Sequence, residues 1–229
     1  MKAAFLILSA LNQHAASVSD ALAQLQQRLI TLNRDFEHSP NALIEYSDIA
    51  LSDEQKQQLL PHADLLAEFR PNNQLIKLKA GLQSAGSPVS STSYHELLKI
   101  IALNWFLQNA HGTNLFKDID YVVILESGAE IGQDLVNLLN KSEALKNKFF
   151  FKKALTSSIQ NEKGRTLMYY PTDTWAYSAE LTDELIDNII DASENAYKQL
   201  EKATDYDSST DLGHELFKAI DLSKIHFLI

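Results

Sequence analysis

The chain has 229 residues and a formal net charge of −10, so it is long enough for one large α/β domain and does not exclude two small ones. Its pI near 5.1 argues against a general nucleic-acid-binding protein, whose footprint would be basic. It has no cysteine, which excludes disulfides, zinc-thiolate sites and thiol catalysis and is compatible with a reducing cytosol.

An apolar run near the N-terminus predicts a first buried strand over residues 3–9. As a signal peptide the run would be short, about nine residues, and it lacks a persuasive cleavage pattern. No stretch reaches the ~20 apolar residues that a membrane-spanning helix needs, so we expect any membrane contact to be peripheral.

Strands and helices alternate through the first part of the chain. The predicted elements are a helix from Ser17 or Ser19 to about Leu32, a strand over 42–46, a short capped helix over 52–60 and a strand over 64–69. This alternation predicts a parallel sheet. Neither a dinucleotide-binding glycine motif nor a P-loop motif is present.

The stretch over residues 118–139 combines a buried strand, a turn and a helix. Residues 121–125 have no polar break, which suits a strand buried on both faces of a parallel sheet. Glu126, Ser127 and Gly128 then supply a carboxylate, a hydroxyl and a residue suited to a sharp bend. Ile131 and three leucines follow at helical spacing. Open α/β sheets present ligands at the carboxyl ends of such strands.

The second part of the chain is predicted to add a hairpin to the sheet. Residues 148–154 form a strand with a basic end, residues 161–164 a hairpin-like turn and residues 166–170 the returning strand. Helices are predicted over 181–202 and 212–220, separated by a polar break over 204–210, with a strand or tail over 225–229. The serine-rich segment 83–93 is interpreted either as a flexible connection or as a functional loop.

Residues 94–139 resemble the middle of GT-A-type nucleotide-sugar glycosyltransferases. In that family a helix leads into an Asp-Tyr-(Val/Ile)-hydrophobic strand, which ends in an Asp-x-Asp motif before a helix with paired leucines. Here a helix over 94–112 leads into the strand, and Glu126-Ser127-Gly128 stands where Asp-x-Asp is expected. The resemblance implies a single three-layer α/β domain over 1–229 with a mainly parallel, mixed central sheet. Residues 1–140 would be its nucleotide-binding half and 141–229 its acceptor-side half.

The resemblance also implies an activity. It points to a hexosyltransferase-type glycosyltransferase of bacterial polysaccharide biosynthesis, in the cytoplasm or at the inner face of the membrane. Such an enzyme moves a sugar from a nucleotide-diphosphate donor to a glycan or lipid-linked acceptor. The departure from Asp-x-Asp supports an alternative, a non-catalytic GT-A-like domain that binds a partner or glycan and has lost the metal motif.

The expected nucleotide-binding residues lie at strand ends or beside them. Glu126 would hold Mn²⁺ or Mg²⁺ on the diphosphate; alternatively it is a strand-end acid that caps the helix starting at Gly132. A carboxylate after the second strand could accept two hydrogen bonds from a base or ribose, and basic residues could neutralise phosphates or simply lie on the surface. The full set is Ser9, Glu45, Asp48, Arg70, Lys99, Glu126 and Gly128.

The expected acceptor side includes Asp173, Trp175 and Tyr177. Aromatic faces stack on sugars, and Asp173 could act as general base on an acceptor hydroxyl. The alternative is a half-buried strand over 172–178. On the late helix, His214 is a further acceptor contact and Glu215 a second catalytic candidate, as similar segments approach the sugar site in some bacterial enzymes; a lone helix histidine is otherwise structural.

Overall fold

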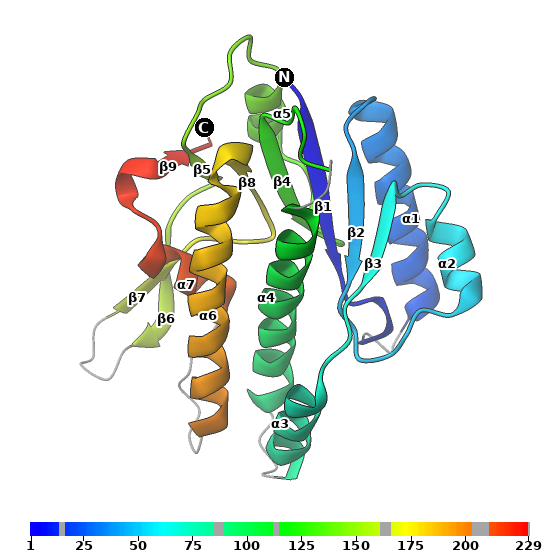
Figure 1. The fold of residues 1–229 in the computed structure, drawn as a ribbon, viewed down its shortest axis with the longest axis vertical. Helices are drawn as coiled ribbons and strands as arrows, with labels where there is room; N and C mark the ends of the chain where they lie inside the picture. The colour runs from blue at the N-terminus through cyan, green and yellow to red at the C-terminus, as the bar shows by residue number, and fades with distance from the viewer. Residues whose placement is uncertain (14–16, 85–88, 112–114, 161–165, 203–210, 229) are drawn as a thin grey trace.

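The computed structural model describes residues 1–13, 17–84, 89–111, 115–160, 166–202 and 211–228. It contains a seven-stranded sheet in the order β3-β2-β1-β4-β8-β5-β9 and a separate two-stranded sheet of β6 and β7 (Figure 1). The strands are β1 (Ala3–Ser9), β2 (Asn41–Glu45), β3 (Leu65–Glu68), β4 (Tyr121–Glu126), β5 (Phe149–Phe151), β6 (Leu155–Gln160), β7 (Thr166–Tyr169), β8 (Thr174–Ser178) and β9 (Ile225–Phe227).

Parallel pairing dominates the large sheet. Strands β1 to β4 pair in parallel, β8 runs antiparallel to both β4 and β5, and β9 pairs in parallel with β5. The predicted α/β class with a mainly parallel, mixed central sheet is therefore confirmed. Tyr121–Glu126 occupies the middle of the sheet, and residues 121–125 are buried, as their apolar sequence predicted.

Helices cover both faces of the sheet. They are α1 (Val18–Asp35), α2 (Asp53–Leu59), α3 (Asn73–Ser84), α4 (Val89–His111), α5 (Gln133–Leu139), α6 (Thr182–Lys202) and α7 (Leu212–Ala219), with short 3-10 turns at Leu11–Gln13, Ala179–Leu181 and Leu222–Lys224. Side chains alternate along each strand. Leu6 and Leu8 of β1 therefore pack with α4, α6 and α7, while Phe5 and Ile7 pack with α1 and α5.

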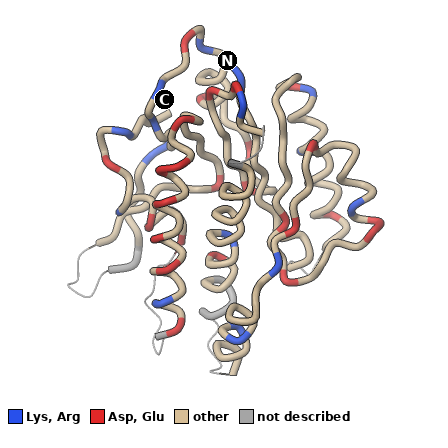
Figure 2. Tube along the Cα trace, in the orientation of Figure 1, with Lys and Arg blue, Asp and Glu red and all other residues tan. Residues whose placement is uncertain are grey.

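Acidic residues lie along the length of α6, which stands beside α4 on one face of the sheet (Figures 1 and 2). The inward side of α6 buries Leu185, Ile189 and Ala196, while Asp187 and Asp191 are exposed. This division explains how a long helix with many acids packs firmly. None of the described helices is long and apolar enough to cross a membrane.

Two features of local structure differ from the predictions. Helix α3 was missed, although Leu75, Leu78 and Leu82 share one side of it and Asn72 Oδ1 accepts hydrogen bonds from the N–H groups of Gln74 and Leu75, both at 3.0 Å. Residues 89–93 of the predicted loop belong to α4. Residues 85–88, together with the expected turn at 161–164 and the break at 204–210, lie outside the described residues.

The hairpin is also arranged differently from the prediction. Strand β7 pairs with β6, whereas β5 pairs with β8 and β9. The three phenylalanines of β5 are fully buried, and only a strand inside the large sheet has both faces covered. Strand β8 is likewise buried along its whole length, more than the half-buried strand that its alternating small residues suggested.

The order of the strands creates a topological switch at β1. The chain passes from β1 to β2 and β3 on one side and later returns as β4 on the other side of β1. In open α/β sheets the crevice outside the carboxyl ends of the strands on either side of such a switch is where ligands bind. The candidate site is therefore expected where β1 and β4 end.

Candidate functional site

Backbone hydrogen bonds tie the strand ends together around the switch. Ser127 N donates to Leu8 O at 2.9 Å, Tyr46 N to Ser9 O at 2.8 Å, and Phe69 N to Glu45 O at 2.8 Å. The hydrogen-bond pattern of the sheet thus continues one residue past β2, β3 and β4. The segments that follow these strands therefore begin side by side at the same edge of the sheet. We call this side of the sheet the carboxyl edge.

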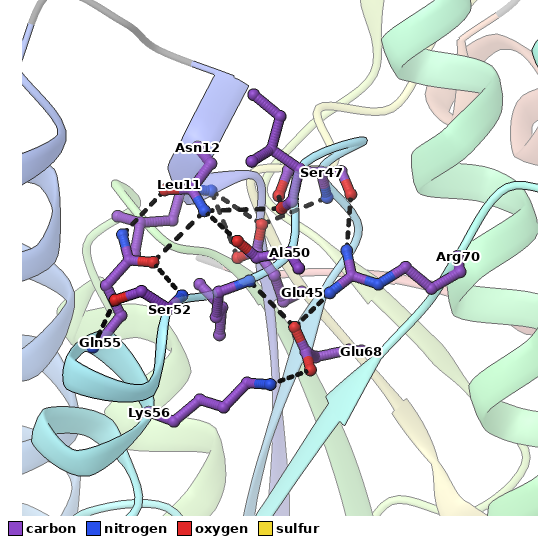
Figure 3. Close-up of polar contacts among 12 residues, drawn as sticks. Leu11, Asn12, Glu45, Ser47, Ala50, Ser52, Gln55, Lys56, Glu68 and Arg70 are labelled. Carbon is purple, nitrogen blue, oxygen red and sulfur yellow. Dashed lines mark hydrogen bonds and ion pairs between the residues drawn. The ribbon is translucent and has the colours of Figure 1, made fainter.

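Glu45 lies at the centre of the loops that follow β1 and β2 (Figure 3). Its side chain is fully buried. Leu11 N donates to both of its oxygens, at 3.0 and 3.2 Å, and Ser47 N donates to Oε1 at 3.2 Å. Burial raises the pKa of Glu45, and the hydrogen bonds from Ser47 and Leu11 offset only part of that effect. The structure thus corrects the expected contact with a base or ribose, because this carboxylate holds two loops in place.

Arg70 also acts within this loop network. It donates to Ser47 O at 3.2 Å and pairs with Glu68, which in turn binds Lys56 at 2.8 Å and accepts from Leu51 N at 3.1 Å (Figure 3). Since its guanidinium already has two partners, Arg70 is placed to order the segment after β2 more than to meet a phosphate.

Asn12 fastens the loop after β1 to the start of α2. Its amide donates to Ala50 O at 2.8 Å and its carbonyl accepts from Gln55 at 2.8 Å (Figure 3). Gln55 in turn completes a capping box with Ser52 at the N-terminus of α2. The capping pattern was visible in the sequence, but the contact with Asn12 was not, because it joins residues 43 positions apart.

Lys99 of α4 forms the most deeply buried ion pair of the carboxyl edge. Its ammonium lies 2.8 Å from Glu126 Oε1 and 2.7 Å from Glu96 Oε2, and only 5% of its side chain is exposed. Burial alone would lower the pKa of Lys99, but the two carboxylates outweigh it and raise the pKa, so the ammonium stays charged. The sequence had named Lys99 and Glu126 separately; the structure pairs them.

Asp173 stands next to Glu126 on the neighbouring strand. Glu126 N donates to Asp173 O at 2.9 Å, which extends the pairing of β4 with β8 by one residue. The Asp173 carboxylate, with 47% of its side chain exposed, pairs with Lys152 at 3.4 Å. Where β4 ends and β8 begins, the carboxyl edge therefore presents two acids, each paired with a lysine.

A divalent metal does not fit this set of donors well. Mg²⁺ and Mn²⁺ seek oxygen ligands, but one oxygen of Glu126 already binds Lys99 and one oxygen of Asp173 faces Lys152. Within the described ranges no group of three or more Asp, Glu or His residues could hold a metal. The acid in the first turn of α5 is Asp134, whereas the Glu126 carboxylate binds Lys99 of α4.

Asp48 lies at the other end of the carboxyl edge, in the segment that follows β2. It pairs with Lys79 of α3 and lies 3.5 Å from the Tyr94 hydroxyl, while the Lys79 ammonium is 5.7 Å from the centre of the Tyr94 ring. Burial and the Asp48 charge raise the pKa of Tyr94. Burial also raises the pKa of Tyr46, whose hydroxyl is near Lys99. Both phenols therefore stay protonated and can donate hydrogen bonds.

The start of α7 brings a second buried polar group to this region. Asp211 caps the helix through His214 N at 2.9 Å and binds His214 Nδ1 at 2.7 Å. The His214 ring is buried and stacks on Tyr169, with ring centres 4.9 Å apart. Burial raises the pKa of Asp211, but the hydrogen bonds from His214 outweigh it and lower the pKa overall, aided by Lys99. Glu215 is buried as well and pairs with Lys218 at 2.6 Å.

Trp175 and Tyr177 belong to the hydrophobic core. Both side chains are fully buried. Trp175 stacks on Phe151 with ring centres 5.5 Å apart, and Tyr177 lies 6.2 Å from Phe149. This placement corrects the expected sugar-stacking role, because the ring faces are covered by other aromatic residues.

Ser9 and Gly128 complete the predicted set. Ser9 is buried at the end of β1. Gly128 is exposed, has no positive φ, and a Cβ added there would meet nothing within 4 Å. The bend after β4 therefore does not require a glycine, contrary to the role expected for it.

The structure thus brings some predicted residues together and separates others. Asp48, Lys99, Glu126 and Asp173 lie along the carboxyl edge, whereas Glu45, Trp175 and Tyr177 are interior residues. Sequence reasoning missed Tyr46, Lys79, Glu96, Lys152 and Asp211. For Lys152 a signal existed in the basic end of its strand; Glu96 precedes Lys99 by three residues, a helical spacing that places oppositely charged side chains together.

No family model and no curated protein matches the sequence. Among solved structures, the chain is similar to the mannosyltransferase Ktr4p from S. cerevisiae in complex with GDP, with a TM-score of 0.54 and 12% identity over 99% of this chain and 68% of that one. It is also similar to core-mannan synthase A (CmsA/Ktr4) from Aspergillus fumigatus in its Mn/GDP form, with a TM-score of 0.50 and 11% identity over 99% of this chain and 72% of that one. At such identities the likeness concerns the fold.

Proposed function

We propose, from the GT-A-type fold that the chain shares with these structures, that it is a glycosyltransferase. It moves a hexosyl group from a nucleotide-diphosphate donor to a glycan or lipid-linked acceptor. The observation that carries the proposal is that the likeness extends over 99% of the chain and relates it to two GDP-bound enzymes. Fold alone does not define function, so the proposal also depends on the chemistry of the carboxyl edge.

The charges of this edge support a donor site. Lys99 and Lys152 reach it from α4 and from the end of β5. An ammonium is a suitable partner for phosphate oxygens, and Lys152, with 35% of its side chain exposed, is the more accessible of the two. The buried Lys99 instead compensates Glu126 and Glu96, which lowers the repulsion that an incoming diphosphate would meet.

Asp173 supports the transfer step. It is the half-exposed acid beside Glu126. As general base it would accept the proton of the acceptor hydroxyl while the hydroxyl oxygen bonds to the anomeric carbon. The bond from that carbon to the diphosphate breaks, and the nucleoside diphosphate leaves with the electron pair. No step is assigned to a metal, since the donor set does not fit one.

Release of sugar from a panel of UDP- and GDP-sugars, with CMP-sugars as the monophosphate comparison, tests the proposal, alongside nucleotide binding by calorimetry. Asp173→Asn should keep nucleotide binding and lose turnover by about a hundredfold or more, the usual contribution of a general base. Asp187→Asn, which removes an exposed acid on α6, is the matched control and should keep both. Absence of nucleotide binding in the wild type, with every member of the panel, would rule the proposal out.

One observation favours a second candidate function, which the same panel of nucleotide sugars tests. The Glu126 carboxylate is engaged by Lys99 at 2.8 Å, which favours a non-catalytic GT-A-like domain that binds a partner or glycan. If the domain is non-catalytic, we expect ligand binding without turnover in the wild type. The wild type and Asp173→Asn should then not differ in binding or turnover.

A further inference from the structure

Two adjoining cavities lie between α1 and the segment from the end of β4 to α5. The smaller, of about 270 Å³, is lined by Gln24, Gln27, Arg28, Thr31, Ser127 and Gly128. The larger, of about 480 Å³, also includes Arg28 and Thr31 in its lining and reaches α5. Because two residues line both, the cavities form one depression, which we call the α1 groove.

The smaller cavity carries a single kind of charge. Arg28 is its one charged residue, surrounded by two amides and two hydroxyl groups. Within the part of the chain that the structure describes, the Arg28 side chain has no ion-pair or hydrogen-bond partner. An unpaired guanidinium surrounded by neutral hydrogen-bonding groups suits a phosphate or carboxylate, which it can bind through two parallel hydrogen bonds.

The larger cavity has a different character. Leu32, Phe36, Ile131 and Val136 supply apolar surface, and Thr31 and Gln133 supply hydrogen-bonding groups. Two acids, Asp35 and Glu130, also line it. The charge of Asp35 is compensated by Arg34 at 2.7 Å, so the anionic group of a ligand belongs at Arg28 in the smaller cavity and a neutral ring in the larger one. The volume falls in the range of small-ligand pockets, which combine apolar walls with a few polar groups. An aromatic ring with neighbouring hydroxyl and amide groups suits the body of a sugar.

We propose that the α1 groove binds an anionic saccharide. Its phosphate or carboxylate lies against Arg28 in the smaller cavity, and its ring lies in the larger cavity beside Phe36. Ser127 and Gly128 of the smaller cavity directly follow Glu126, whose carboxylate contacts Lys99 of α4 on the opposite face of the sheet. The groove is thus separate from the proposed donor site but adjoins it at the end of β4. If the proposed transferase function holds, the saccharide is the acceptor.

Ligand-observed and protein-observed NMR without any nucleotide tests the groove. The probes are glucuronic acid and glucose 1-phosphate, each compared with neutral glucose. We expect both anions, or the one whose group fits, to bind more tightly than glucose and to shift the backbone amides of Ser127 and Gly128. Arg28→Gln should weaken anion binding by about tenfold or more, the effect of losing a charged hydrogen bond, and leave the weak binding of glucose unchanged.

Lys198→Gln is the matched control, since Lys198 is an exposed cation of α6 that lines neither cavity and pairs only with Glu194 among the described residues. It removes the same charge and should leave binding unchanged. Equal binding of anionic and neutral sugars, equal loss in Arg28→Gln and Lys198→Gln, or shifts away from Ser127 and Gly128 would overturn the inference. A protein that binds the anions but no nucleotide contradicts the proposed function only, and the reverse result contradicts the α1 groove only.

Discussion

The backbone N–H of Glu126 donates a 2.9 Å hydrogen bond to the carbonyl oxygen of Asp173. These two residues are 47 positions apart in the sequence, yet they bring the acids of β4 and β8 to neighbouring places on the carboxyl edge. Each acid has a lysine from a third element, Lys99 from α4 and Lys152 from the end of β5. This part of the site is therefore organised around two lysine–carboxylate pairs, and the first predictions follow from them.

Lys99→Met should destabilise the fold strongly. The substitution leaves Glu96 and Glu126 without the ammonium that they share, and removing one partner of a buried ion pair typically costs about 3–5 kcal/mol. Since 38% of the Glu126 side chain is exposed, solvent reduces the penalty and we expect the lower end, about 3 kcal/mol. Denaturant unfolding measures it.

Lys198→Met provides the comparison for this loss. Lys198 pairs with Glu194 on the surface of α6, with 60% and 61% of the two side chains exposed, so its removal should cost at most about 1 kcal/mol. Similar losses in the two variants would contradict the buried role of Lys99. Adding Glu126→Gln to Lys99→Met should recover part of the loss, because one uncompensated charge is removed.

Glu126→Gln should not change how strongly Mn²⁺ affects nucleotide binding. The Glu126 carboxylate is compensated by Lys99 and does not supply a free pair of oxygens to a metal. We therefore expect the ratio of nucleotide affinities with and without Mn²⁺ to be the same in both proteins. A loss of affinity in Glu126→Gln of about tenfold or more that occurs only with Mn²⁺ would show that this residue does hold a metal.

Gly213→Ala should destabilise the chain while Gly128→Ala should not. A Cβ at position 213 would lie 2.1 Å from the carbonyl oxygen of Tyr170, so the start of α7 must move away from the end of β7. Such overpacking typically costs about 1–3 kcal/mol. Position 128 offers open space and an ordinary backbone conformation, so the alanine should be neutral or slightly stabilising. Unfolding midpoints of the two variants test this, and equal effects would contradict it.

The stability contribution of Glu45 should fall as the pH rises. Burial raises its pKa above the usual 4.5, so the folded chain holds the proton more tightly than the unfolded chain. The contribution is full below pH 4.5 and is lost as the pH rises through the raised value. Glutamine at this position does not titrate. The unfolding free energy of the wild type relative to Glu45→Gln should therefore decrease from acidic to neutral pH.

Asp211 should show the opposite dependence. The hydrogen bonds from His214 outweigh burial and lower the pKa of Asp211 below the usual 3.8. Its contribution is present above pH 3.8 and is lost as the pH falls through the lowered value. The wild type should accordingly lose stability relative to Asp211→Asn on acidification. If the unfolding free energy of the wild type relative to Glu45→Gln and relative to Asp211→Asn changed with pH in the same direction, the opposite pKa shifts of the two acids would be contradicted.

The sequence by itself determined the fold class and most of the elements. The apolar run 121–125 predicted the central strand, and leucines at helical steps predicted α1, because burial and periodicity act within a few residues. Helix α3 was missed although Leu75, Leu78 and Leu82 recur at helical spacing; of its residues only Leu75 is buried in the structure. The pairing of β5 with β8 and β9 was not predicted either. Which strands pair depends on how the whole sheet assembles and not on the nearest turn in the sequence.

Only the tertiary structure decided which polar residues form the site. Glu45 and Glu126 both end strands, yet one is buried under the backbone N–H groups of Leu11 and Ser47 and the other meets Lys99 at the edge. Trp175 lies in the core because β8 is an inner strand with helices on both faces. The charge and burial of a side chain depend on neighbours that are distant in sequence, and these are set only when the sheet assembles.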